Sequence, residues 1–361
     1  MGTIHQPAQM ERYWDSIDDI SGGLSLGLMS DNALNDSGGW VRTPVFASQD
    51  TWVIQAAFRN TDFLDGLNPQ NAGLYFREGG AEQLSMVIVP AAGSGGLTAG
   101  YMYGIEVRRG ATVLAASDPI FFSQEWTIFQ FKATVDIGVG GAYEVKASRR
   151  ENETQEAFAT ILSGSGTNTA DTGASGVDQV EINYDVQSGS AIWDHFWMMD
   201  DQGSVNNDFP GKFLMVHGMV PNADGAQDDW IAQGGQGTGY QTVDDPANST
   251  SDDIGRQISE NIGDIFLTAF PDPGGAHPIS GSANVAGVIF THVSAMENSG
   301  TLTVRPIYRN AANTRAEGAD QALSGTEYAG YFEVFEQDPV ALAAWTVSQV
   351  KAMQWGLKVQ S

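Results

Sequence analysis

The stretch EWTIFQFKATVDIGVGGAYEVKA, residues 125–147, indicates how this chain folds. Side chains of a β-strand point alternately to its two faces. One set of alternating positions is apolar throughout and comprises Phe129, Phe131, Ala133 and Val135. The other set mixes apolar and polar side chains and comprises Trp126, Ile128, Gln130 and Lys132. The alternation predicts a strand whose first set faces a hydrophobic core.

Strand-like runs of the same kind recur along the chain, for example at residues 51–60, 72–79 and 142–151. They are short, rich in β-branched and aromatic residues, and bounded by Gly, Pro, Asn or Asp. Their spacing is close to the roughly 8 to 12 residues typical of antiparallel sandwiches. The best helix candidates are residues 8–18 and 346–353. We therefore predict an all-β fold of two tandem antiparallel β-sandwich (jelly-roll) domains with little helix.

The length of 361 residues corresponds to about two domains. A turn-rich segment, DDQGSVNNDFPG, breaks the strand pattern at residues 200–211. We place an N-terminal arm at 1–20, a first sandwich at 21–203 and a second at 204–361. In the second half, VAGVIFTHVSAM is almost continuously apolar, which predicts a central strand buried on both faces.

Composition narrows the possible partners. The formal net charge of −27 opposes binding to nucleic acid and to anionic membranes. The chain has no cysteine, which excludes disulfides and thiolate metal sites and favours assembly in a reducing cytoplasm. The N-terminus lacks the pattern of a signal peptide, and no run approaches the ~18 apolar residues of a membrane span. We expect no nucleic-acid partner, no membrane insertion and no cofactor.

Metal ligation has one candidate region. No two of the five histidines lie three or four residues apart, so a helical metal motif is missing. Oxygen ligands suited to calcium gather instead near the turn-rich segment, and the candidates are Asp200, Asp201, Asn206 and Asp208. They lack the EF-hand order and its final Glu, and the favoured interpretation is a turn whose side chains bond their own backbone.

The acidic residues near the C-terminus do not form a hydrolase pair. Glycoside hydrolysis needs two carboxylates facing one groove. Glu333 and Glu336 are three residues apart, which puts them on opposite faces of a strand, and Asp338 precedes a proline that favours a turn. We predict no catalytic residues.

Residues 331–359, which include these acidic residues, also predict the closing elements of the second domain. Thr346 is a plausible N-cap of a short helix, and Gly356 a plausible end of it. Trp345 and Trp355 flank this helix, and we predict that they fill the open end of the sandwich. Together with Trp126, they are predicted to be structural rather than ligand-binding.

Residues 21–201 resemble a laminin-G-like or concanavalin-A-like jelly roll. The resemblance rests on the order of GGWVRTPVF, NAGLYFREG, the stretch at 125–147 and AIWDHFWMMDDQG. It implies that the strand beginning at Trp126 pairs with the strand at 142–148 across the glycine-rich turn. The incomplete acidic run near Asp338 departs from the glycan-cleaving members of this group.

The whole chain also resembles structural proteins of tailed-bacteriophage virions, which are acidic, cysteine-free, glycine-rich tandem β-domains. This resemblance implies a non-enzymatic virion component, assembled in the host cytoplasm, in the tail or tail tip or as a capsid decoration. Its partners would be other virion proteins and copies of itself. Residues 7–15, with Tyr13 and Trp14, are either a docking arm or a segment folded onto its own domain.

Two alternatives stay open. The first is a glycan-binding module for host attachment, which needs exposed aromatic side chains beside polar groups. Trp230 and Tyr240, in a long glycine-rich connection, are its candidates, whereas Trp40 and Trp52 are expected in the core. The second is a hydrolase, which the missing carboxylate pair disfavours.

Overall fold

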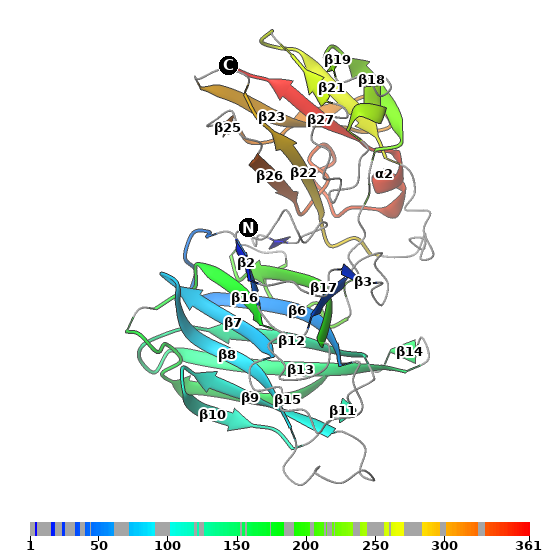
Figure 1. The fold of residues 1–361 in the computed structure, drawn as a ribbon. Helices are drawn as coiled ribbons and strands as arrows, with labels where there is room; N and C mark the ends of the chain where they lie inside the picture. Colours follow the sequence, from blue (N-terminus) through cyan, green and yellow to red (C-terminus); the bar gives the residue numbers. More distant parts are fainter. Residues whose placement is uncertain are drawn as a thin grey trace. The chain divides into compact units, whose positions relative to one another are not determined.

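A computed structural model describes most of the chain. The described residues are 4–5, 16–18, 24–25, 33–36, 40–43, 45–60, 72–90, 102–118, 121–122, 126–151, 154–155, 157–173, 175–183, 191–202, 206–212, 214, 219, 221–233, 239–243, 256–259, 261–270, 284–296, 301–323 and 329–361. They are nearly all β, and every strand pairing among them is antiparallel, for example between β12 (Trp126–Thr134) and β13 (Gly141–Glu151). The chain divides into two compact units, Met1–Val216 and His217–Ser361 (Figure 1). The predicted fold class, two tandem antiparallel β-sandwiches with little helix, is confirmed.

Unit 1 contains a nine-stranded and an eight-stranded sheet. The nine-stranded sheet has the order β14-β13-β12-β6-β17-β4-β3, with β1 beside β17 and β15 beside β13. Its other strands are β1 (Ile4–His5), β3 (Leu24–Ser25), β4 (Ala33–Asp36), β6 (Thr51–Asn60), β14 (Thr154–Gln155), β15 (Ala159–Thr167) and β17 (Ala191–Asp200).

The eight-stranded sheet has the order β10-β9-β8-β7-β16-β5-β2, with β11 beside β9. Its strands are β2 (Ser16–Asp18), β5 (Trp40–Arg42), β7 (Gly73–Glu78), β8 (Ala81–Pro90), β9 (Met102–Arg109), β10 (Thr112–Ala116), β11 (Phe121–Phe122) and β16 (Gln179–Asn183). Figure 1 shows this sheet, from β10 to β16, as one layer in front of β6, β12 and β13.

One hydrophobic core joins the two sheets of unit 1. The apolar set predicted from the opening stretch, Phe129, Phe131, Ala133 and Val135, belongs to this core. Phe131 meets Phe76 of the opposite sheet with ring centroids 5.1 Å apart. The hairpin that the jelly-roll resemblance implied is present, because β12 pairs with β13 across residues 135–140. The Asp136 carboxylate accepts hydrogen bonds from Gly138 N and Gly140 N in this turn.

The mixed face of β12 is covered by the chain that follows β17. Gln130 is buried and donates to the Lys212 carbonyl at 2.9 Å, while Gln55 donates to the Leu214 carbonyl at 2.8 Å. These bonds satisfy side-chain amide N–H groups that would otherwise be buried without acceptors. The two compact units divide at 216/217, and the predicted boundary was 203/204. Trp126 is also buried on this face, in a small cluster with Ala57 and Ile128.

Parts of the predicted N-terminal arm belong to the sheets of unit 1. β1 pairs with β17, and β2 pairs with β5. The predicted helix at residues 8–18 is wrong at its C-terminal end, where residues 16–18 form β2. Tyr13 and Trp14 lie outside the described residues.

Unit 2 contains a six-stranded sheet with the order β18-β21-β27-β23-β24, with β25 beside β23, and two two-stranded sheets, β19-β20 and β22-β26. The strands are β18 (Ala223–Asp228), β19 (Ile231–Gln233), β20 (Arg256–Ile258), β21 (Ile265–Ala269), β22 (Val288–Ser294), β23 (Leu302–Arg309), β24 (Arg315–Glu317), β25 (Gln321–Leu323), β26 (Ala329–Phe335) and β27 (Gln354–Val359). A 3-10 helix, η1, spans Gly239–Thr242.

The apolar run at 285–296 does not form the predicted central strand. Among the described strands, β22 pairs with β26 alone. The described side chains of β22 are half-buried or exposed. Phe290 of this pair stacks on Trp355 of β27 at 5.5 Å, which joins the small sheet to the large one.

The closing elements largely follow the prediction. Thr346 caps α2 (Val347–Ala352) in a capping box with Gln349. Trp345 and Trp355 are buried in one cluster, and the Trp345 indole N–H donates to the Phe335 carbonyl at 2.7 Å. Gly356 does not end the helix, because it lies within β27. A Cβ at this position would lie 1.7 Å from the Phe266 carbonyl oxygen, so the close approach of β21 requires glycine.

Candidate functional site: the polar outer face of the eight-stranded sheet

A concentration of charged side chains lies on the face of the eight-stranded sheet that points away from the core. Val41, Val180 and Ile182 point into the core, so their neighbours point outward. The same alternation in β7, β8 and β9 directs further polar residues outward. We call this set the polar face, and it comprises Trp40, Arg42, Tyr75, Arg77, Glu82, Ser85, Glu106, Arg108, Glu181 and Asn183.

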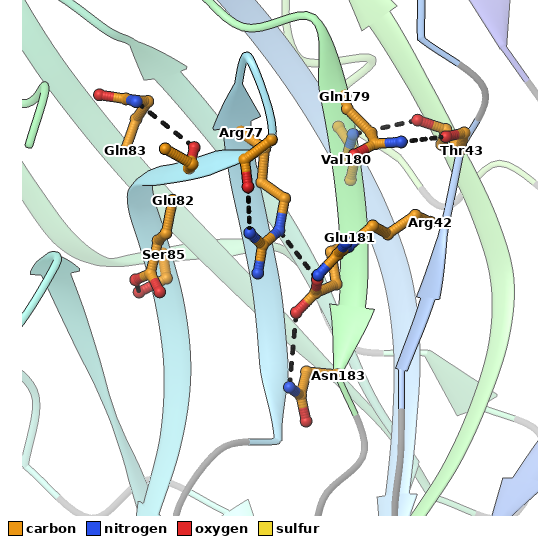
Figure 2. A network of polar contacts seen from close by, with 12 residues as sticks. Arg42, Thr43, Arg77, Glu82, Gln83, Ser85, Gln179, Val180, Glu181 and Asn183 are labelled. Carbon is orange, nitrogen blue, oxygen red and sulfur yellow. Dashed lines mark hydrogen bonds and ion pairs between the residues drawn. The ribbon is translucent and has the colours of Figure 1, made fainter. Parts of the chain in front are cut away.

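Glu181 is the centre of the polar face (Figure 2). Its side chain is almost fully buried, and one carboxylate oxygen accepts from Arg42 Nε at 2.6 Å and from Arg77 Nε at 2.8 Å. Burying a carboxylate is costly unless opposite charges and hydrogen bonds compensate for lost hydration. Two guanidinium groups supply that compensation here. Three strands, β5, β7 and β16, are thereby joined by side chains as well as by their backbones.

The two arginines are held in place by further contacts. Arg77 Nη1 donates to the Gly80 carbonyl at 2.8 Å. The Arg42 guanidinium lies 3.8 Å from the centroid of the Trp40 ring, a cation–π contact. Asn183 donates to the second Glu181 oxygen at 3.4 Å. The arginines keep part of their surface exposed, 24% and 14% of their side chains, so a ligand can reach them.

Two neighbouring titratable groups of the polar face, Tyr75 and Glu82, have raised pKa values. Burial, together with the nearby Glu82 and Glu181 carboxylates, raises the pKa of the Tyr75 hydroxyl. Burial also raises the pKa of Glu82, against a hydrogen bond from Ser85 at 2.9 Å that lowers it. Tyr75 therefore holds its proton and is a poor general base. Glu106 is paired with Arg108. The polar face is suited to hydrogen bonding and stacking, and its charges are largely neutralised within the sheet.

The calcium candidates do not converge. Asp200 accepts from Gln202 N at 3.0 Å, and Asp201 accepts from the Gln202 side chain at 2.7 Å. Asp208 accepts from Lys132 Nζ at 3.0 Å. Asn206 has a φ of 51°, as in many tight turns. Within the described ranges, no group of three or more His, Asp or Glu residues is placed to hold a metal ion.

The pKa of the Asp208 carboxyl reflects this ion pair. Partial burial alone would raise it, but hydrogen bonds from Lys132 and from Phe209 N outweigh that effect, and the pKa is lowered. The contacts of this carboxylate are those of an ion pair and a turn.

The predicted glycan candidates are both half-buried in unit 2. Trp230 packs against Phe266, with ring centroids 6.0 Å apart, and contributes to a core cluster. Tyr240 lies in η1, and its backbone N–H donates to Asp224 at 2.7 Å. Trp230 serves the packing of unit 2 more than a binding surface.

Trp40 is the aromatic residue that sequence reasoning missed. It was expected in the core with Trp52, which is indeed buried. Trp40 is instead half-buried on the polar face. The strand WVR contains the signal, because Val41 is the central residue of an alternating triplet and its two neighbours must share the opposite face.

His292, one of the five histidines, is held by two side chains in unit 2. Gln321 donates to the Phe332 carbonyl, which turns its Oε1 toward His292 Nε2 at 2.7 Å. His292 Nε2 is then the donor, and Nδ1 accepts from Ser294 Oγ at 2.8 Å. Burial lowers the pKa of His292 to about 4, so the ring is neutral at pH 7.

Comparisons with known proteins leave the family open. No protein-family model matches the sequence, and no curated protein matches it. No described helix has the length and apolar character needed to cross a bilayer.

Several solved structures resemble part of the chain. One is alginate lyase Aly36B bound to alginate tetrasaccharide (10% identity, 52% of this chain, 94% of that chain, TM-score 0.34). Another is an endo-β-1,4-glucuronan lyase from the fungus Trichoderma reesei (11% identity, 55% and 94%, TM-score 0.32). A third is the exoplasmic/lumenal domain of VIP36, bound to Ca²⁺ and Man3GlcNAc (11% identity, 52% and 89%, TM-score 0.31). Likeness at this level carries no argument about activity or ligand.

Proposed function

We propose that this chain is a non-enzymatic structural component of a tailed-bacteriophage virion, associated with the tail or tail tip. It acts through protein–protein contacts with other virion proteins and with copies of itself. The sequence supports this proposal through its acidic, cysteine-free and glycine-rich composition. A capsid-decoration protein would have the same kind of composition and the same kinds of protein–protein contact, but it would lie on the head rather than on the tail.

The pairing of charges on the polar face is the observation that carries the non-enzymatic part of the proposal. Glu181 is neutralised by Arg42 and Arg77, and Glu106 by Arg108. Tyr75, the phenol beside them, has a raised pKa. A catalytic acid–base pair needs groups whose pKa values lie near the working pH. This face has the features of a rigid surface rather than of a reaction centre.

Immunogold labelling of purified particles tests the proposal. Antibody against the chain should label intact particles at one end of the tail, and labelling over the head would assign the decoration role instead. Antibody that labels no particle, although the chain is abundant in the lysate, would contradict a virion role.

Glycan binding by unit 1 is the second candidate function, and Trp40 is the observation that favours it. The Trp40 ring has the Arg42 guanidinium against it and lies opposite Asn183 in the strand register, so the two residues beside it can add hydrogen bonds to stacking on a sugar. A glycan array tests this role, with Trp40→Ala as the variant. Trp230→Ala is a less suitable control because Trp230 supports packing, so Tyr240→Phe serves as the matched control.

The array and a parallel assay for sugar release have three informative outcomes. Binding that falls at least tenfold in Trp40→Ala and persists in Tyr240→Phe supports the polar face as the glycan site. Absence of binding to every host polysaccharide would remove this candidate. Release of sugar fragments by the wild-type chain would contradict the non-enzymatic proposal.

A further inference from the structure

A turn in unit 2 presents an apolar side chain to solvent at a position that strains its backbone. Leu342 is 77% exposed and has a φ of 53°, in the left-handed region. Twelve described residues have a positive φ; nine are glycine, two are asparagine, and Leu342 is the remaining one. Leucine lacks the freedom of glycine to adopt a positive φ, and this exposed leucine gains no stability from burial.

Hydrogen bonds to the buried Asp338 hold the turn that carries Leu342 in a fixed conformation. Asp338 is buried and accepts from Val340 N at 2.8 Å and Ala341 N at 3.0 Å. Its second oxygen accepts from Tyr308 Oη at 3.1 Å and Gln349 Nε2 at 2.7 Å. The backbone closes the turn through Asp338 N to Ala343 O and Leu342 N to Asp338 O. Such a turn loses little conformational entropy when it binds.

Two further exposed apolar side chains lie at the other end of the same unit. Ile262 is 74% exposed and Ile231 is 62% exposed. Ile262 lies at the C-terminal end of β27, because its neighbour Gly263 donates through its backbone N–H to the carbonyl of Val359. The Leu342 turn lies at the start of β27, because the nearby Trp345 packs against Trp355. Asp229, two residues before Ile231, bonds Ile265 at the same end as Ile262. α2 and the C-terminus lie at the two ends of β27 (Figure 1).

The charges at the two ends differ. Residues 339–350, which include the Leu342 turn, contain no charged side chain, and the first that follows is Lys351. The other end carries Asp228, Asp229 and Asp264 close to its exposed isoleucines. The Leu342 turn therefore adds no negative charge of its own, so the acidic end of a second copy can approach it without repulsion from this segment.

We propose that unit 2 binds a second copy of this chain head to tail, with the Leu342 turn of one copy packed against Ile231 and Ile262 of the next. A contact between different surfaces of identical chains generates a ring if it closes and a filament if it does not. The inference rests on the proposed function, in which the chain assembles with copies of itself.

Sedimentation velocity of the full-length chain tests the contact with two complementary variants. Wild-type chain should form species larger than a dimer as concentration rises. Leu342→Asp and Ile262→Asp should each weaken self-association at least tenfold. An equimolar mixture of the two should form dimers, because each variant retains the end that the other has lost. Wild-type chain that stays monomeric at its highest soluble concentration, or a mixture that stays monomeric, overturns the proposal.

Two further variants separate contact from folding. Leu342→Gly relieves the strained backbone, so its melting temperature should be unchanged or higher while association is lost. Association that persists in Leu342→Gly overturns the proposal. Val139→Asp places the same kind of change at an exposed apolar residue of unit 1, and it should associate like the wild type. If Val139→Asp lost self-association to the same extent, the contact would have to involve unit 1.

These outcomes are independent of the virion assignment. A chain that self-associates but is absent from particles retains the contact and loses the proposed function. A chain that is present in particles but monomeric in every assay retains the function and loses the contact.

Discussion

Glu181 in unit 1 and Asp338 in unit 2 are both 1% exposed, yet they are stabilised by different kinds of donor. Glu181 binds two guanidinium groups, from Arg42 and Arg77. Asp338 binds neutral donors: two backbone N–H groups, the Tyr308 hydroxyl and the Gln349 amide. Both arrangements offset the loss of hydration.

The difference between the two sites shows in what each leaves at the surface. The arginines around Glu181 are partly exposed and form a polar surface on a sheet. The donors around Asp338 are used in shaping a turn, and that turn exposes Leu342 rather than a charge. A buried carboxylate therefore supports a polar contact surface in one unit and an apolar contact point in the other.

The largest expected effect concerns the tryptophan that follows the Asp338 turn. Trp345→Ala should lower the free energy of unfolding of unit 2 by about 4 kcal/mol, because it leaves a cavity beside Tyr308 and Trp355. Trp345→Phe keeps most of the ring and loses the bond to the Phe335 carbonyl, at a cost of about 1 to 2 kcal/mol. Thermal unfolding measures both. An unchanged melting temperature in Trp345→Ala would mean that the tryptophan does not fill the core.

Removal of the neutral-donor site should have the next largest effect. Asp338→Ala leaves the Tyr308 hydroxyl, the Gln349 amide and two backbone N–H groups without their acceptor, which should cost about 3 kcal/mol. Burial and the Asp338 carboxylate together raise the pKa of Tyr308, so the variant should also shift the absorbance titration of this tyrosine to lower pH. A titration identical to wild type would contradict the contact.

The charged site should be less sensitive. Glu181→Gln removes the counter-charge of two partly hydrated arginines, and we expect a loss of about 2 kcal/mol in unit 1. Water reaches the arginines and reduces the penalty. The loss should shrink at about 1 M salt, whereas that of Asp338→Ala should not. Chemical denaturation with urea measures both, and equal salt responses would remove the distinction between the two sites.

A pH dependence that arises from a histidine is expected in unit 2. His292 has a folded pKa of about 4, below the unfolded value of 6.5, so the unfolded state binds the proton more readily between these pH values. Above pH 6.5 the contribution of His292 to the free energy of unfolding does not change. As the pH falls toward 4, the protein loses about 1 to 2 kcal/mol of stability at this half-buried ring. Glutamine does not titrate in this range. The difference in free energy of unfolding between the wild type and His292→Gln should therefore change between pH 6.5 and pH 4. A constant gap from pH 7 to pH 4 would place the ring in solvent.

The smallest effect is expected at an exposed carboxylate. Asp208→Asn breaks an ion pair with Lys132 in which both side chains are substantially exposed, and it should cost about 0.3 kcal/mol. Added calcium should leave the melting temperature of wild type and variant unchanged. A calcium-dependent rise that the variant loses would revive the metal interpretation of this region.

Local patterns predicted several of these features. The alternation around Phe129 and Phe131 identified the core face of β12, and Thr346 identified the start of α2. Both depend on residues within a few positions of one another. Gly356 was misread as a helix end, because the carbonyl that requires a glycine there belongs to Phe266, 90 positions away in the chain.

The polar face was not predictable in the same way. Glu181 is separated from Arg42 by 139 positions and from Arg77 by 104, so their pairing depends on strand order. A lone glutamate between Val180 and Ile182 in the strand QVEIN was the available signal. The apolar run around Phe290 was misread because one apolar pattern fits both a central strand and a small sheet packed on Trp355.

The central claim is that this chain functions by assembling into a virion. Quantitative mass spectrometry of gradient-purified particles, with isotope-labelled peptides of the chain as standards, tests it most directly. A virion component should be present at a fixed copy number per particle that stays constant across particle preparations. A chain found only in the soluble lysate, or at a copy number that falls with each round of purification, would contradict it.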